Sequence, residues 1–351
     1  MILSYIIQIV LCLLLLVILL FIGYYIYNYE NLMDLKNSTV LRKDIIVFNG
    51  IMNFKTSQNW QYNTYNKSSI TFRDLTPSIN QNGGAEYTYN FWLKINKNVI
   101  NTVNSSDIVL LLRGSKIKIP YINNTNCEIY NKGSYILLKN PLIRMKSDGS
   151  AIIVEYNTLT NPDAYRENGN TVINCASASW YDKNKGLLGI YKMDDYTYNN
   201  KWFMFTVVLR EITPENDILY KNKTSCKIYI NGLNVLDRIV ESPYNGSLGS
   251  ATMKHNRGAL FVNPGDIYST NSEKIGSNPL ENVQSEDDIL NMANLTYHNY
   301  ALDDVEILNL FKTEFTKSPA LPPLNDDNLY QPDKYAIANV SEQSGNFPLP
   351  F

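Results

Sequence analysis

The chain opens with a long apolar stretch and then changes to short segments in which apolar and polar positions alternate. From Tyr5 to Tyr27 almost every side chain is apolar, and no charged side chain precedes Glu30. A helix of this length covers about 35 Å at about 1.5 Å per residue, more than a hydrocarbon core of about 30 Å. The pattern predicts one membrane-spanning helix, with residues 1–29 as the anchor and lipid contacts through residues 5–27.

A cleaved signal peptide is the alternative interpretation of this stretch. Signal peptides have a basic start, a shorter apolar core and a small-x-small cleavage site, and the first 30 residues match none of these features. Basic residues follow the stretch at Lys36, Arg42 and Lys43, and none precedes it. The positive-inside rule therefore predicts a single-pass membrane protein whose C-terminal bulk lies on the cytosolic side.

After a linker over residues 30–44, short apolar or alternating segments are separated by Asn-, Gly-, Ser- and Pro-rich connections. The segments with the pattern of β-strands are residues 44–54, 86–95, 107–114, 134–146, 150–157, 186–193, 201–211 and 225–235. One late segment, Leu302–Phe315, has the apolar spacing of a helix with Asp303 or Asp304 in its first turn. Many strands and one short helix predict an all-β, two-sheet antiparallel sandwich over residues 45–316.

The segment KIYINGLNVLDRIV, residues 227–240, predicts a β-hairpin. Asn and Gly tolerate the positive φ angles that a two-residue type I′ turn requires, so the turn is expected at Asn231-Gly232. Alternation then places Ile228 and Ile230 on one face of the hairpin and Tyr229 on the other.

Three segments, in the same order along the chain, resemble the concanavalin A-like, laminin-G-like jelly-roll family. They are EYTYNFWLKI with its Phe-Trp pair, NKWFMFTVVLRE followed by CKIYINGLNV, and NLTYHNYALDDVEILNLFK. The resemblance spans residues 87–315 and implies a jelly-roll sandwich, while residues 116–192 match nothing in the family. Trp92 and Trp202 are expected to fill the core between the sheets, and a sugar-stacking platform is their alternative role.

Composition and charge narrow the classes of function. A net charge of −2 with 18% charged residues supplies no basic field, so no nucleic-acid partner is expected. Asn, Ile, Tyr and Lys are favoured, as in the AT-rich genomes of protists, some bacteria and large DNA viruses. Beyond the apolar stretch, Cys127, Cys175 and Cys226 form an odd set. This favours reduced buried thiols, with one bridge plus a free thiol as the alternative.

The sequence offers no catalytic set. Glucanases related to the family carry Glu-x-Asp-x-x-Glu on one strand, and the nearest acidic cluster here, Glu286–Asp288, lacks the final Glu. His255 and His298 lie near no Ser or Cys motif, and zinc-ligand spacing is missing. We therefore predict no enzyme activity and no cofactor. If the domain held Ca²⁺, as some family members do, Asp194 and Asp195 would be the candidate ligands; a solvated loop is the alternative.

Residues 317–351 are rich in Pro and predict an extended strap outside the sandwich. Its apolar side chains are the predicted partner-binding residues: Leu321, Leu324, Tyr330, Tyr335, Phe347 and Phe351. A disordered tail is the alternative. Deleting the strap is expected to leave the sandwich folded and to weaken assembly.

Together these features predict a non-enzymatic, membrane-anchored structural or interaction protein. Membrane-anchored laminin-G-like sandwiches occur among proteins of large DNA viruses. The resemblance therefore implies a minor capsid or virion membrane protein that links an internal membrane to the capsid shell through other protein subunits. A membrane-anchored, glycan-binding, lectin-like adhesion protein is the alternative. On the cytosolic side the Asn-x-Ser/Thr triplets would stay unmodified, among them Asn66, Asn104, Asn222, Asn245 and Asn294.

Overall fold

In a computed structural model, the chain divides into two compact units, residues 1–42 and 43–351. The residues it describes are 14–15, 17–18, 20, 24, 42–55, 60–79, 84–96, 107–118, 135–156, 158–159, 164–167, 170–173, 187–193, 198–212, 223–240, 252–253, 258–264, 267, 289–317, 321–322, 324–325 and 328–330. Each unit is described by itself.

Most of the predicted anchor lies outside the described residues. The anchor residues that the structure describes are helical and exposed: Leu14, Leu15, Val17, Ile18, Leu20 and Tyr24. Within the described part of the chain, no helix is long and apolar enough to cross a membrane. The anchor at residues 5–27 therefore stays a prediction.

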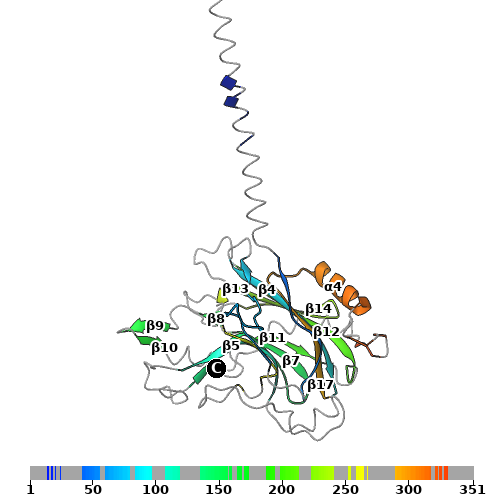
Figure 1. Cartoon of the computed structure of the whole chain (residues 1–351). Coiled ribbons are helices and arrows are strands. Elements are labelled where there is room, and N and C mark those ends of the chain that lie inside the picture. The colour runs from blue at the N-terminus through cyan, green and yellow to red at the C-terminus, as the bar shows by residue number, and fades with distance from the viewer. Residues whose placement is uncertain are drawn as a thin grey trace, which may run out of the picture. The chain divides into compact units, whose positions relative to one another are not determined.

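The second unit is a sandwich of two antiparallel sheets (Figure 1), as the strand pattern predicted. The seven-stranded sheet has the order β1-β17-β4-β12-β13-β14, with β3 paired to β4. These strands are β1 (Asp44–Asn53), β3 (Ser78–Ile79), β4 (Ala85–Ile95), β12 (Trp202–Ile212), β13 (Lys223–Ile230), β14 (Leu233–Val240) and β17 (Leu290–His298).

The six-stranded sheet has the order β11-β7-β6-β5-β16-β2. Its strands are β2 (Trp60–Tyr62), β5 (Ile108–Lys118), β6 (Tyr135–Met145), β7 (Ala151–Glu155), β11 (Leu187–Lys192) and β16 (Leu260–Val262). Residues 116–192, which resemble nothing in the family, thus supply β6, β7 and β11 to this sheet. Two small ribbons, β8 (Thr158–Leu159) with β15 (Thr252–Met253) and β9 (Ala164–Glu167) with β10 (Asn170–Ile173), lie outside both sheets.

The hairpin forms as predicted. Asn231 and Gly232 have φ angles of 50° and 81° and connect β13 to β14. Ile228 and Ile230 belong to the core between the sheets, whereas Tyr229 belongs to a second apolar cluster on the outer face of the seven-stranded sheet.

The position expected for Trp92 and Trp202 is wrong in one respect. Both are buried, but they lie in the outer cluster and not between the sheets. Their neighbours Phe91 and Phe203 occupy the core instead. Because successive side chains of a strand point to opposite faces, filling the core with these phenylalanines directs the tryptophans outward.

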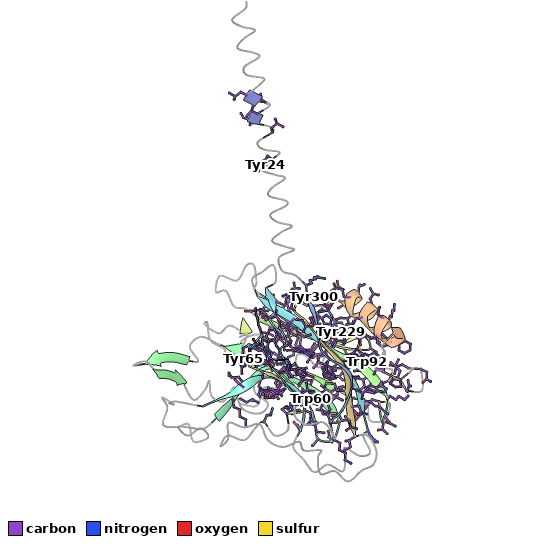
Figure 2. All side chains as sticks on the ribbon, in the orientation of Figure 1. Tyr24, Trp60, Tyr65, Trp92, Tyr229 and Tyr300 are labelled. Carbon is purple, nitrogen blue, oxygen red and sulfur yellow. The ribbon has the colours of Figure 1, made fainter. Side chains whose placement is uncertain are left out.

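The one helix among the described residues of this unit, α4 (Asp304–Lys317), covers the outer face that carries the tryptophans. Figure 2 shows Trp92 and Tyr229 beside α4, and Trp60 and Tyr65 away from it. The predicted helix, Leu302–Phe315, is confirmed with both ends shifted by two residues, which is within the usual uncertainty of helix termini.

Candidate interaction site

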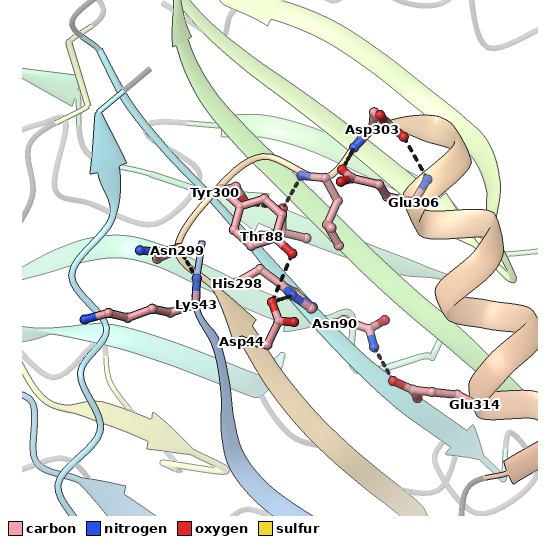
Figure 3. Close-up of polar contacts among 11 residues, drawn as sticks. Lys43, Asp44, Thr88, Asn90, His298, Asn299, Tyr300, Asp303, Glu306 and Glu314 are labelled. Atoms are coloured by element: carbon pink, nitrogen blue, oxygen red, sulfur yellow. Dashed lines mark hydrogen bonds and ion pairs between the residues drawn. The ribbon is translucent and has the colours of Figure 1, made fainter. Parts of the chain in front are cut away.

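Helix α4 is fixed to the seven-stranded sheet by a partly buried carboxylate (Figure 3). Glu314 accepts a hydrogen bond from Asn90 Nδ2 at 3.1 Å and another from Trp92 Nε1 at 2.5 Å. Asn90 Oδ1 in turn accepts from Thr206 Oγ1 at 2.8 Å. Burial raises the pKa of Glu314, and the bonds from Trp92 and Asn90 and the nearby His298 oppose that rise. The carboxylate therefore joins the helix to β4.

The first turn of α4 is held by its own side chains and by the hairpin. Asp303 Oδ1 accepts from the Glu306 amide at 2.7 Å, and Glu306 Oε2 accepts from the Asp303 amide at 2.9 Å, which is a capping box. The Tyr229 hydroxyl donates to Asp304 Oδ1 at 2.5 Å. Burial and the Asp304 carboxylate raise the pKa of Tyr229, so the phenol stays a donor.

His298 pairs with the carboxylate of Asp44 between the first and last strands of the seven-stranded sheet. Its Nδ1 lies 2.7 Å from Asp44 Oδ1, which also accepts from the Tyr300 hydroxyl at 3.0 Å. Nε2 of His298 is buried and has no hydrogen-bond partner among the described residues. Among the described residues, no hydroxyl or thiol is bonded to this nitrogen in the way that a Ser-His-Asp arrangement requires. It ties the start of β1 to the end of β17.

The C-terminal segment belongs partly to the sandwich, which corrects the predicted domain boundary at residue 316. The Trp202 amide donates to Asn328 O at 2.7 Å, and the Tyr330 amide donates to Trp202 O at 2.9 Å. Tyr330 is 1% exposed within the core, and its hydroxyl lies 3.1 Å from that of Tyr191. Asn231 Nδ2 donates to Tyr330 O.

Three of the predicted partner-binding residues are therefore used inside the chain. Leu321 is buried in the outer cluster, Leu324 packs against that cluster, and Tyr330 is in the core. These side chains are not free for a partner, because the tail follows the sheet closely enough to pair with β12. Tyr335, Phe347 and Phe351 lie outside the described residues.

The outer face of the six-stranded sheet carries a buried ionic network. Glu155 Oε1 accepts from Arg144 Nε at 2.8 Å, and Glu155 also pairs with Lys139, while Arg144 pairs with Asp107. Lys139 and Glu155 are fully buried. Buried charges are tolerated only when paired in this way, since desolvation is costly. These side chains are committed to one another and do not form an open ligand site.

An apolar part of the seven-stranded sheet stays open near β1. The β1 shelf, as we name Ile46, Ile51 and Thr296, continues the outer face past α4. Cα register places Ile51 beside Ala293 and Ile46 beside Thr296, one strand away from β4. Ile46 is 59% and Ile51 50% exposed, whereas Ala293 is fully buried. The β1 shelf is thus an exposed apolar border of a covered face.

Several predicted site residues cannot be placed. Asp194, Asp195, Glu286–Asp288 and His255 lie outside the described residues, as do Cys127 and Cys175. No group of His, Cys, Asp or Glu within the described ranges could hold a metal ion. Cys226 is a buried free thiol, and burial raises its pKa to about 12.

Sequence reasoning missed Glu314 and the β1 shelf. A signal for Glu314 was present, because this acidic residue sits between Phe311 and Phe315 on the apolar side of the helix. Ile46 and Ile51 gave no such signal, since apolar residues in an edge strand are equally compatible with burial.

No protein-family model and no curated protein matches the sequence. Similar solved structures include the botulinum neurotoxin type G receptor binding domain, with 13% identity, a TM-score of 0.31 and coverage of 78% of this chain and 46% of that one. The receptor binding domain of botulinum neurotoxin D has 12% identity, a TM-score of 0.33 and coverage of 78% and 48%.

The binding domain of botulinum neurotoxin DC, in complex with rat synaptotagmin II, has 13% identity, a TM-score of 0.31 and coverage of 65% and 35%. The chain spans less than half the length of each of these structures. At such TM-scores the sandwich assignment rests on the strand pairing of the chain itself. Membership of the concanavalin A-like family stays a prediction.

Proposed function

We propose that the chain is a non-enzymatic structural protein, anchored in a membrane by residues 5–27, that binds a second protein through the β1 shelf. The observation that carries the proposal is the exposure of Ile46 and Ile51 at the border of the face that α4 covers. Apolar surface that continues a packed face is the kind that a protein partner buries.

The rest of both outer faces supports this choice over a sheet-face glycan site. Trp92 and Met204 are buried in the cluster beneath α4, and Arg144 and Glu155 are buried on the other sheet. A glycan groove needs exposed polar groups beside an aromatic platform. Ile46 and Ile51 provide apolar surface only, so the shelf suits a protein better than a sugar.

The β1 edge favours side-chain packing over the addition of a partner strand. Its register with β17 shifts twice, between Ile46 and Phe48 and between Phe48 and Ile51. Val47 O already accepts from Arg73 Nε at 3.0 Å. Bulges and covered carbonyls interrupt the hydrogen-bonding row that strand addition requires. The partner would therefore lie over the isoleucine side chains.

The partner that we propose is a capsid subunit, and the membrane is the internal membrane of a large DNA virus particle. The Asn-, Ile- and Tyr-rich composition and the predicted cytosolic placement support this role, because the capsid-facing side of such a membrane is topologically cytosolic. Residues 331–351, with Tyr335, Phe347 and Phe351, would add contacts to the same partner.

The test uses the full chain in vesicles and the shell protein of the virus that encodes it. The shell protein should float with vesicles that carry the wild-type chain and should be lost from those that carry the double variant Ile46→Asp/Ile51→Asp. Ile239→Asp is the control, because Ile239 is 54% exposed on the opposite edge strand, β14. Equal flotation with all three chains would exclude the shelf, and none with the wild type would exclude the capsid role.

A further inference from the structure

A loop between β2 and β3 presents apolar side chains to solvent on an ordered backbone. Ile70 is 97% exposed and Tyr65 is 67% exposed. We name residues 65–70 the Tyr65–Ile70 tip. No acidic residue occurs from Trp60 to Arg73, and Lys67 lies within the tip. The tip thus combines an aliphatic residue, an aromatic residue and a cation.

The tip keeps its shape through its own hydrogen bonds. Asn63 Oδ1 accepts from the amides of Tyr65 at 2.9 Å and Asn66 at 2.7 Å. Ser69 O accepts from the Phe72 amide at 3.0 Å, and Asn66 O accepts from the Ser69 amide at 3.1 Å. Four of the six backbone amides of the tip donate within the loop. These bonds lower the cost of ordering and desolvating the backbone in contact with an apolar phase.

The loop that carries the tip is attached to the end of the sandwich where the chain enters it. Asp74 pairs with Lys43 at 3.5 Å, one residue before β1 begins. Arg73 Nε donates to Val47 O at 3.0 Å, and the Arg73 amide donates to Asn63 O at 2.8 Å. The arms of the loop are therefore joined to each other and to the first residues of β1.

We propose that the Tyr65–Ile70 tip docks on the lipid surface of the membrane that holds the anchor. This inference rests on the proposed anchor at residues 5–27. Lys43 follows Tyr27 by 16 residues, which limits the separation to about 55 Å at full extension. Ile70 would enter the interface, Tyr65 would lie at headgroup level and Lys67 would face anionic phosphates.

Attachment of the chain to the membrane through the anchor makes the small contact of the Tyr65–Ile70 tip sufficient for docking. One isoleucine and one tyrosine would not hold a free domain on a membrane, since even a single lipid chain gives only marginal binding. Attached to an anchor, the same contact becomes intramolecular and takes place at a high effective concentration. The docked tip would fix the orientation of the sandwich and leave the β1 shelf for the protein partner.

The test places a photoreactive diazirine amino acid at position 70 of the full chain, reconstituted in vesicles of phosphatidylcholine and phosphatidylserine. Position 51 is the control, because Ile51 is another solvent-exposed isoleucine, 50% exposed against 97% for Ile70, and lies seven residues beyond Asp44, about 23 Å along β1. After irradiation, lipid adducts at position 70 should exceed those at position 51 several-fold.

Flotation of the same vesicles separates the possible failures. If the chain does not float, the anchor is wrong, and the proposed function and this inference both fall. If it floats and lipid adducts are equal at the two positions, only the docking of the tip is overturned. Adducts of position 70 with protein in place of lipid would also overturn it and would make the tip a protein contact.

Discussion

Trp202 and Trp60 show how differently two side chains of one type are used. Trp202 is 3% exposed and pairs through its backbone with the C-terminal segment, whereas Trp60 is 48% exposed on a short edge strand. Glu314 gives a similar contrast with the exposed carboxylates, because it is partly buried at the junction of α4 and β4. At this scale burial, not residue type, sets the energetic role.

Trp202→Ala should lower the free energy of unfolding by roughly 3–5 kcal/mol, the usual range for emptying a large buried site. Trp60→Ala should lower it by less than about 1 kcal/mol, because surface changes have small effects. Urea unfolding followed by circular dichroism measures both. Similar losses for the two variants would contradict the burial argument.

Glu314 should make the domain less stable as pH rises. Its folded-state pKa is above the ordinary 4.5, mainly through burial, so the folded state retains the proton in a range where the unfolded state has released it. The contribution of Glu314 to the free energy of unfolding is fully present below about pH 4.5, the ordinary pKa. It is lost as the pH rises through the pKa of the folded state.

The free energy of unfolding of the wild type, minus that of Glu314→Gln, should therefore decrease from acidic to neutral pH. Glu306→Gln in the same helix is the control for a general effect of losing a carboxylate. A difference that stays flat or increases with pH would show that folding does not raise the pKa of Glu314.

Among the elements, α4 depends on the strands beneath it and on its own cap. Its amphipathic face covers Trp92 and Tyr229, and the hairpin turn lies close to it: a Cβ added to Gly232 would be 3.1 Å from the Leu308 Cα. The C-terminal segment packs beside the helix on the same face through Leu321 and Leu329.

Asp303→Ala should cost about 1 kcal/mol of stability, because it removes the N-cap acceptor of α4. Asp303→Asn should retain most of that stability, since Asn caps helices as well as Asp does. Val305→Ala, at a residue that is 66% exposed in the same turn, is the control. Equal melting temperatures for Asp303→Ala and wild type would show that the cap is unimportant.

Truncation should separate the two parts of the tail. Ending the chain after Tyr330 should leave the melting temperature of the sandwich unchanged and weaken binding of the proposed partner. Ending it after Lys317 should destabilise the fold by several kcal/mol, because Tyr330 leaves the core. The expectation that the whole strap could be removed is thus restricted to residues 331–351. A stable chain ending at Lys317 would reverse this conclusion.

For the whole molecule, one arrangement unites the proposals: an anchor, a lipid-facing tip, a sandwich with committed outer faces and a shelf for protein. Both contact surfaces are connected to β1: the loop of the tip is attached at Lys43 and Val47, and the shelf extends from Ile46 to Ile51. The sandwich would then act as a spacer between a membrane and a shell.

Expression in cells that glycosylate lumenal domains tests the predicted side of the membrane. Asn66 lies in the exposed tip, and its triplet should stay unmodified if the sandwich is cytosolic. The mass of the chain should not change on glycosidase treatment. A mass shift that disappears in Asn66→Gln would place the tip in the lumen and would favour the cell-surface lectin alternative.

The sequence by itself located most of the long strands and the helix of the sandwich, but not β2 or β16. Alternation and turn residues located β1, β4, β12, the hairpin and α4, because these signals are local and depend on neighbouring positions. It also identified Trp92 and Trp202 as buried. In β4 the polar residues Glu86, Asn90 and Lys94 alternate with apolar ones, so the pattern also indicated that Trp92 lies on the face away from the core. In β12, however, both faces are apolar, so alternation could separate the two faces without indicating which one met the other sheet.

Tertiary structure alone decided that assignment and the contacts between distant residues. Asp44 and His298 are separated by 254 positions, and Asn90 and Glu314 by 224. No local pattern relates such pairs, since their proximity follows from strand order and from where the chain returns. For the same reason only the fold could show that Tyr330 fills the core, while Ile46 and Ile51 are left at an uncovered edge.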